Sequence, residues 1–306
     1  MRYWKIENFL FLNKYLLVLI LIGGVNLSSR TLLAKEVVDY SGAHVKLVEI
    51  PSRVVTLAPS LAELVVDLLD DGFDRLVGVS EYSDYPPALK KLPSIGPYHR
   101  FNLEKVISLK PDLVLATFDG NSKDQVLHLR ELGVPVVIVG TQSFQEIQDS
   151  MRLVGLSLGR ESRGVQMAKQ FKTGIEQLQK KVKARKGLPL RVMLQVGDQP
   201  LVVVGKGSFL HSALEAIETR NIYFDTEGRY PKPSLEDVLK RNPDVIVVIA
   251  LGEEIETYRE MAERWKRFSQ LKAVSTKRVY VLKSDALLRP TLRFLEGLTL
   301  LDRLLY

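Results

Sequence analysis

Apolar and polar residues follow one pattern twice along the chain, at residues 102–116 and 234–248. The first stretch reads NLEKVISLKPDLVLA and the second reads SLEDVLKRNPDVIVV. Each begins with a residue suited to capping a helix, Asn102 or Ser234, and places an acid two positions later, near the positive end of the helix dipole. Each then reaches Pro-Asp before an aliphatic run, so the proline ends the helix. The sequence therefore predicts the same unit twice: a helix that leads into a buried strand.

Around these repeats, short aliphatic runs alternate with helical patterns. We predict further strands at residues 53–57, 76–79, 134–139, 190–195, 201–204 and 278–282, with helices between them. Such alternation is typical of a parallel sheet covered by helices on both faces. A small hairpin is predicted at residues 36–48, and Ser60 followed by Glu63 predicts a capping box at the first helix.

Residues 161–186 contain no proline and space their apolar residues as a helix does. At ~1.5 Å per residue this helix would be about 40 Å long, enough to cross from one lobe to the other. We therefore predict an α/β protein of two similar lobes, each a mainly parallel sheet flanked by helices, joined by one long bridging helix. The predicted N-terminal lobe is 35–160, the bridging helix 161–187 and the C-terminal lobe 188–306.

Composition narrows the functional classes. The 306 residues are 46% hydrophobic and 26% charged, which is typical of a globular protein. Part of the net charge of +7 lies in residues 1–34, and the remaining basic residues cluster only at 180–186, on a predicted helix. No nucleic-acid partner is therefore expected. The chain has no cysteine, which excludes disulfides, thiolate metal sites and a lipoprotein anchor.

The start of the chain has the layout of a secretory signal. An apolar stretch at residues 16–25 follows Arg2, Lys5 and Lys14. The uninterrupted apolar run is roughly ten residues long, short of the ~20 that span a bilayer. We predict that residues 1–34 are a signal peptide, or alternatively an uncleaved anchor.

The segments ahead of the first repeat carry a resemblance to a known family. Residues 53–60 read RVVTLAPS, residues 77–79 read VGV, and residues 80–87 read SEYSDYPP. With NLE at residues 102–104, the chain resembles the helical-backbone class of periplasmic binding proteins and, within it, the cobalamin (vitamin B12) binding components of ABC importers. The resemblance implies a periplasmic monomer without a cofactor or enzymatic activity. It would bind cobalamin or a related corrinoid between its lobes and deliver it to an ABC permease dimer with its ATPase.

The resemblance also implies which residues touch the ligand. These are Ser60, Tyr82 and Tyr98 from the first lobe, and Val196, Val202, Tyr230, Asp285 and Arg289 from the second. Aromatic faces suit a broad flat ring, and fixed polar groups suit its rim of amides. Tyr98 and Tyr230 stand where well-known cobalamin binders have tryptophan, and Val196 and Val202 stand where they have phenylalanine. Each replacement removes flat apolar area, so we expect either a wider cleft with lower affinity or a ligand that differs in detail.

An exposed glutamate on each lobe is implied to dock to the permease. Glu104 and Glu236 occupy equivalent positions in the two repeats. The alternative is that each only stabilises its helix through the dipole, by ~0.3 to 1 kcal/mol. Symmetric placement on both lobes, together with the resemblance, favours docking.

Three rival functions stay open. Within the same class, the ligand could be haem or a ferric siderophore, because Tyr98 or His99 could ligate haem iron. A metal-cluster scaffold or enzyme would need clustered cysteines, histidines or an acid-base pair, and the four histidines have no metal-ligand spacing. The third rival is a surface-anchored interaction protein that retains residues 1–34.

Overall fold

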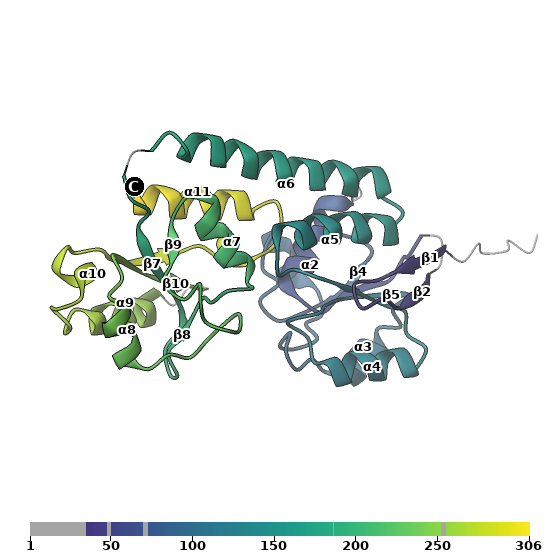
Figure 1. Cartoon of the computed structure of the whole chain (residues 1–306). Coiled ribbons are helices and arrows are strands. Elements are labelled where there is room, and N and C mark those ends of the chain that lie inside the picture. The colour runs from purple at the N-terminus through teal and green to yellow at the C-terminus, as the bar shows by residue number, and fades with distance from the viewer. Residues whose placement is uncertain (1–34, 48–49, 70–72, 186, 252–254) are drawn as a thin grey trace, which may run out of the picture. The chain divides into compact units, whose positions relative to one another are not determined.

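Two mainly parallel sheets, one in each half of the chain, form the frame of the computed structural model (Figure 1). The structure describes residues 35–47, 50–69, 73–185, 187–251 and 255–306. These belong to one unit, Ala34–Tyr306. The predicted signal segment, residues 1–34, lies outside the described residues. No helix within the described ranges is long and apolar enough to cross a bilayer.

The first lobe is built on a four-stranded parallel sheet in the order β4-β3-β5-β6. Its strands are β3 (Val54–Thr56), β4 (Leu76–Val79), β5 (Leu113–Thr117) and β6 (Val136–Val139), and its helices are α2 (Pro59–Leu68), η1 (Pro87–Lys91), α3 (Leu103–Ser108), α4 (Lys123–Glu131) and α5 (Phe144–Ser157). Alternate residues of β5 point to opposite faces. Leu113 and Leu115 pack with α2 and α5, whereas Val114 and Ala116 pack with α3 and α4. The predicted hairpin is present as β1 (Lys35–Val38) and β2 (His44–Leu47).

The second lobe is built on a sheet in the order β11-β10-β7-β8, with β9 beside β7. Its strands are β7 (Arg191–Gly197), β8 (Val202–Val203), β9 (Arg220–Asn221), β10 (Val245–Ala250) and β11 (Val279–Lys283), and its helices are α7 (Phe209–Ala216), α8 (Leu235–Arg241), α9 (Ile255–Trp265), α10 (Lys272–Ser275), η2 (Ala286–Leu288) and α11 (Phe294–Leu305). The strand β8 runs antiparallel to β7, and β9 and α10 were not predicted. The other pairings are parallel, so the predicted fold class is confirmed.

Both repeats form the predicted unit. The side chains of Asn102 and Ser234 cap α3 and α8 by accepting hydrogen bonds from the backbone N–H three residues later, at 2.9 and 3.2 Å. The aspartate after each proline then fixes the start of the neighbouring strand. Asp112 accepts the N–H of Arg53 at 2.8 Å, and Asp244 accepts that of Arg191 at 2.8 Å. The repeat is thus a means of joining one strand to the next.

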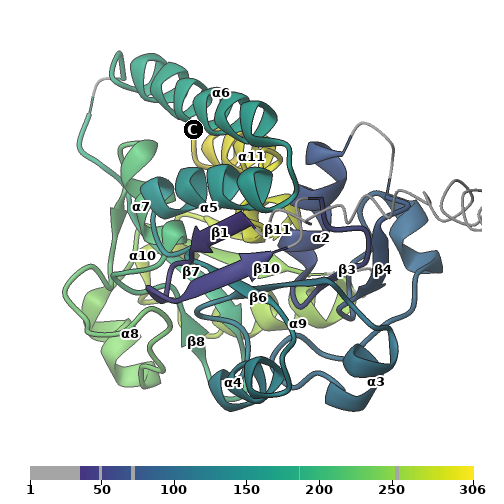
Figure 2. The same ribbon diagram turned by 90° about the vertical axis from the view of Figure 1, so that its right-hand side faces the viewer.

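The long helix α6 (Glu161–Val182) spans 22 residues, about 33 Å at 1.5 Å per residue, and ends four residues before the predicted limit. Figures 1 and 2 show it running along α5 and α11. Its crossing with α5 requires Gly155 and Gly164, because a Cβ on Gly155 would lie 2.8 Å from the Cα of Gly164.

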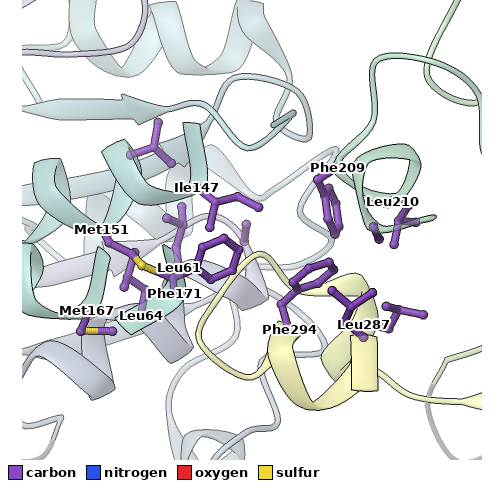
Figure 3. Packing of buried hydrophobic residues seen from close by; sticks show 14 of the residues in the cluster. Leu61, Leu64, Ile147, Met151, Met167, Phe171, Phe209, Leu210, Leu287 and Phe294 are labelled. Carbon is purple, nitrogen blue, oxygen red and sulfur yellow. The ribbon is translucent and has the colours of Figure 1, made fainter. Parts of the chain in front are cut away.

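One apolar core connects the two lobes beneath α6. Phe294 of α11 packs against Phe144 of α5, Phe171 of α6 and Phe209 of α7, with ring centroids 5.5 to 6.0 Å apart. Figure 3 shows Phe171, Phe209 and Phe294 together with Ile147 of α5. Side chains from both halves therefore share one cluster.

The predicted capping box at Ser60 and Glu63 is wrong. The helix α2 begins at Pro59, and Ala58 is its N-cap without a side-chain hydrogen bond. Proline favours the first helical position, since its fixed φ suits a helix and its missing N–H would have no partner there. Ser60 consequently lies inside the helix, and Glu63 is free for a different partner.

Candidate functional site

The predicted ligand residues gather at the carboxyl ends of strands in both lobes. Ser60 is the second residue of α2, four residues after β3, and is 9% exposed. Val196 lies near the end of β7, and Asp285 lies two residues after β11. In open α/β sheets, ligands bind outside the carboxyl ends of the strands. The strand β5 ends at the same edge of its sheet, and Asp119 follows it.

Tyr98 and Tyr230 lie on either side of a contact between the two lobes. The ring of Tyr98 lies against Gly120, whose added Cβ would come within 3.2 Å of it. The preceding residue, Asp119, forms an ion pair with Arg229, which is adjacent to Tyr230. Tyr98 and Tyr230 are 43% and 44% exposed. Two accessible aromatic side chains, one from each lobe, therefore flank a single contact between the lobes.

Protein atoms surround much of the side chain of Tyr230. Burial is the largest cause that raises its pKa, to about 12; Arg229 acts in the opposite direction, and Tyr98 and Asp119 reinforce the rise. Tyr230 is nevertheless 44% exposed, so its side chain also presents accessible surface.

The segment that carries Tyr230 is held close to β8. The N–H of Gly205 donates to the carbonyl of Arg229 at 2.8 Å, and the N–H of Val203 donates to that of Pro231 at 3.1 Å. A Cβ on Gly205 would lie 2.5 Å from the carbonyl oxygen of Gly228. Glycine is therefore required at position 205 for this close approach.

Tyr82 presents its side chain to solvent from an unusual backbone conformation. It is 69% exposed and has φ of 65°. For a bulky residue this region is rare, and such a conformation costs on the order of 1–3 kcal/mol unless its surroundings hold it. The guanidinium of Arg289 donates to the Tyr82 carbonyl at 3.0 Å. The second lobe thus supports the conformation of a predicted ligand residue in the first.

Arg289 is buried and spans the two lobes. One terminal nitrogen donates to Glu63 of α2, and the other donates to Asp84 at 2.6 Å as well as to Tyr82. Only 8% of the residue is exposed. Its terminal nitrogens are thus engaged by the protein.

Arg293 completes this network. It donates to Glu63 at 2.8 Å and to Asp285 at 3.3 Å, and its guanidinium carbon lies 3.3 Å from the centre of the Tyr85 ring. Thr291 donates its hydroxyl to the second oxygen of Glu63 at 3.2 Å. We name Glu63, Asp84, Asp285, Arg289, Thr291 and Arg293 the interlobe network.

The charges of the interlobe network stabilise one another. Burial by itself lowers the pKa of Arg289, but hydrogen bonds to Glu63 and Asp84 outweigh it and raise the pKa overall. Burial raises the pKa of Glu63, against the opposing effect of Arg289 and Arg293. With two guanidinium groups and a hydroxyl donating to its oxygens, we assign Glu63 as a carboxylate.

The two valines contribute less surface than the tyrosines. Val196 is half-buried and packs against the main core, and Val202 is half-buried on β8. The side chain of Val202 lies over Gly197, where an added Cβ would meet it at 3.0 Å. This corner is therefore lined by small aliphatic groups.

Glu104 and Glu236 are both exposed, each in the first turn of its helix. Neither forms an ion pair with another described residue within 4.0 Å. Figures 1 and 2 place α3 and α8 on the side of their lobes opposite α6. The two carboxylates are thus equivalent and accessible.

Sequence reasoning missed several residues that shape this region. The sequence pattern predicted that Glu63 belongs to a helix capping box. It gave no role to Asp84, Asp119, Arg229 or Arg293. A glutamate between apolar residues in LAELVV (residues 61–66) was the local signal for Glu63, because a charge at such a position needs a partner if it is buried. The aromatic pair Tyr40 and Phe118, with centroids 5.1 Å apart and both exposed, also lies beside Asp119.

The described residues contain no group of three or more histidine, aspartate and glutamate side chains that could hold a metal. His99 contacts the Tyr98 ring edge-on, at 5.5 Å between centroids. The remaining chemistry of the region is aromatic faces, hydroxyls and a paired charge network, which suits binding.

A model of the periplasmic binding protein family matches residues 54–286, most of the chain. The chain belongs to the periplasmic binding protein family. The family assignment agrees with the expectation that it is a binding protein and not an enzyme.

Relatives of this binding protein include the vitamin B12-binding protein of Vibrio cholerae, which is 30% identical over 246 residues, covering 80% of this chain and 86% of the relative. The crystal structure of the periplasmic vitamin B12-binding protein of Vibrio cholerae superposes with a TM-score of 0.72 at 30% identity, covering 83% of this chain and 96% of that one. A periplasmic haem-binding protein from a Roseiflexus species gives a TM-score of 0.73 at 25% identity, with coverage of 83% and 98%. These neighbours agree with the two-lobe fold of this binding protein.

Proposed function

We propose that the protein captures cobalamin or a related corrinoid between its two lobes and delivers it to an ABC permease. The observation that carries this proposal is the placement of accessible tyrosines from both lobes beside one interlobe contact, at the carboxyl ends of the strands. The similarity to vitamin B12-binding relatives supports the choice of ligand.

In this proposal the ligand residues divide by chemistry. Tyr82, Tyr98 and Tyr230 offer aromatic faces to the ring, and Val196 and Val202 line the corner beneath it. Ser60 and Asp285 offer polar groups to the amide rim. Arg289 borders the site, but its terminal nitrogens already bind the protein, so its contribution is largely to hold Tyr82.

Delivery would use the two equivalent glutamates. Glu104 and Glu236 are exposed, lie in matching helix turns and have no ion-pair partner among the described residues, so both can meet positive groups on a permease dimer. We further propose that the protein acts in the periplasm as a monomer with residues 1–34 as its export signal, and that its lobes are 35–160 and 188–306, joined by 161–187.

The test is a calorimetric titration of the purified protein with cyanocobalamin. We expect saturable one-to-one binding that weakens by at least roughly tenfold per tyrosine when Tyr82 and Tyr98 are changed to alanine, because each removes an aromatic face. Lys206→Ala is a matched surface control and should bind as the wild type does. Absence of saturable binding would refute the proposal for cobalamin.

Haem is a second candidate, favoured by the edge contact between Tyr98 and His99 and by the similarity to a haem-binding protein. A parallel titration with hemin, followed by its absorbance, separates the two. Haem ligation would produce an iron-tyrosinate or iron-imidazole spectrum that Tyr98→Phe or His99→Ala abolishes. Tight hemin binding without cobalamin binding would keep the binding role and change the ligand.

A further inference from the structure

Glu63 is a buried carboxylate whose partners all come from a distant part of the chain. It is 2% exposed, and Arg289, its partner, lies 226 residues away in sequence. Its other donors, Thr291 and Arg293, belong to the same short segment before α11. A buried charge is retained at a cost in desolvation that a well-packed apolar residue would avoid. Neither the helix α2 nor its cap requires a carboxylate here.

Arg289 connects this carboxylate to a ligand residue. Its first terminal nitrogen bonds Glu63 and its second bonds both the carbonyl of Tyr82 and the carboxylate of Asp84. Because the guanidinium is planar and rigid, the orientation fixed by Glu63 also fixes where the second nitrogen points. A change in the position of Glu63 would therefore change the hydrogen bonds that Arg289 makes to residues 82–84.

The loop at Tyr82 depends on this support. The N–H of Glu81 donates to Gly96 at 2.8 Å and that of Ser83 donates to Ser80 at 3.2 Å, so both neighbours of Tyr82 are tied to the first lobe. Tyr82 itself keeps positive φ and an exposed ring, and its carbonyl is held from the second lobe. Loss of that hydrogen bond would leave the least favourable backbone conformation of the turn without its partner.

We infer that Glu63 is a positioning residue for ligand binding, which orients Arg289 so that Arg289 holds Tyr82 in its ligand-facing conformation. The inference rests on the proposed function for its effect on affinity. It does not require Glu63 to touch the ligand.

The first arm of the test needs no ligand. Hydrogen–deuterium exchange of the full chain should show faster exchange at the amides of residues 80–85 in Glu63→Gln, which keeps the size and removes the charge. Arg289→Lys, which removes the planar fork but keeps the charge, should act in the same direction. Asp302→Asn is the matched control, since Asp302 is also a buried carboxylate paired with an arginine, Arg185 at 2.6 Å, near the far end of α11. It should lower the melting temperature without changing exchange at residues 80–85.

The second arm is a double-mutant cycle with cyanocobalamin, or with hemin if only hemin binds. Glu63→Gln should weaken binding roughly tenfold in the wild-type background and have little further effect when Tyr82 is already alanine. A purely structural role would weaken binding equally in both backgrounds. Equal weakening, or unchanged exchange at residues 80–85, would overturn the inference. If the wild type binds neither ligand, the proposed function fails, and the exchange experiment still decides whether Glu63 positions Tyr82.

Discussion

Two of the ion pairs that link the described parts of the lobes, Glu63–Arg289 and Asp119–Arg229, differ in character. At Glu63 and Arg289 the side chains are 2% and 10% exposed, and several hydrogen bonds satisfy both groups. At Asp119 and Arg229 the side chains are 14% and 36% exposed, beside the accessible rings of Tyr98 and Tyr230. The buried contact is in a position to hold the lobes together, whereas the open ion pair can separate when a ligand binds.

The apolar core also holds the two lobes together. Phe294 and its ring neighbours pack the lobes together beneath α6. The interlobe network adjoins α11 through Arg293, which is the N-cap of α11. We therefore expect little relative motion of the lobes on binding. Any opening should be concentrated at the Asp119–Arg229 contact.

The largest expected effect is at the buried contact. Glu63→Ala should lower the free energy of unfolding by about 3–5 kcal/mol, because it leaves Arg289 and Arg293 buried without their shared carboxylate. Urea denaturation followed by circular dichroism measures this change. A loss below about 1 kcal/mol would mean that the buried pair behaves like a surface pair, and the contrast between the contacts would disappear.

A smaller effect is expected next to the open contact, from Gly205→Ala. The new methyl group would meet the carbonyl of Gly228 and the ring of Pro231, so the 229–231 segment must shift, at a cost of about 1–3 kcal/mol. Thermal denaturation and ligand titration should show reduced stability together with weaker binding, since Tyr230 moves. Gly42→Ala, which has open space around it but also positive φ, controls for backbone strain without steric conflict. Equal effects of the two changes on binding would contradict this explanation.

The environment of the Tyr230 hydroxyl can be tested by alkaline titration. Its pKa is raised from 10.0 to about 12, so the folded state favours the neutral phenol. The free energy of unfolding should be unaffected by this group below pH 10 and should fall as the pH rises from about 10 to about 12. Ultraviolet difference absorbance of the wild type and Tyr230→Phe should differ by a tyrosine that ionises near pH 12. A difference centred near pH 10 would indicate an ordinary surface tyrosine.

The smallest expected effect is at the open ion pair itself. Asp119→Asn should change the free energy of unfolding by no more than about 1 kcal/mol, because a partly exposed pair gains little over its hydrated ions. The same denaturation assay applies, with Glu63→Gln measured alongside. If Asp119→Asn proved more destabilising than Glu63→Gln, the open contact would be the one that holds the lobes together, which contradicts our interpretation.

Much of the fold could be predicted from local patterns. The repeated capping residues, the Pro-Asp pairs and the helical spacing of residues 161–182 appear in the structure as predicted, because each acts within a few residues. The direction of β8 was not predicted, since a two-residue strand carries no sign of which partner it will find. The candidate ligand residues came from a resemblance, and the structure adds that they lie at the carboxyl ends of strands or on the loops beside them.

The sequence by itself determined the two α/β units, the long helix and the equivalent positions of Glu104 and Glu236, since helix capping and side-chain periodicity are local properties. Only the tertiary structure decided the partners of Glu63 and the placement of Tyr98 and Tyr230 on either side of the Asp119–Arg229 pair. A carboxylate near a helix start can cap that helix or enter the interior, and both are compatible with the same sequence. Which of these occurs depends on the donors that the fold brings within hydrogen-bond distance, and here Arg289 and Arg293 arrive from the other end of the chain.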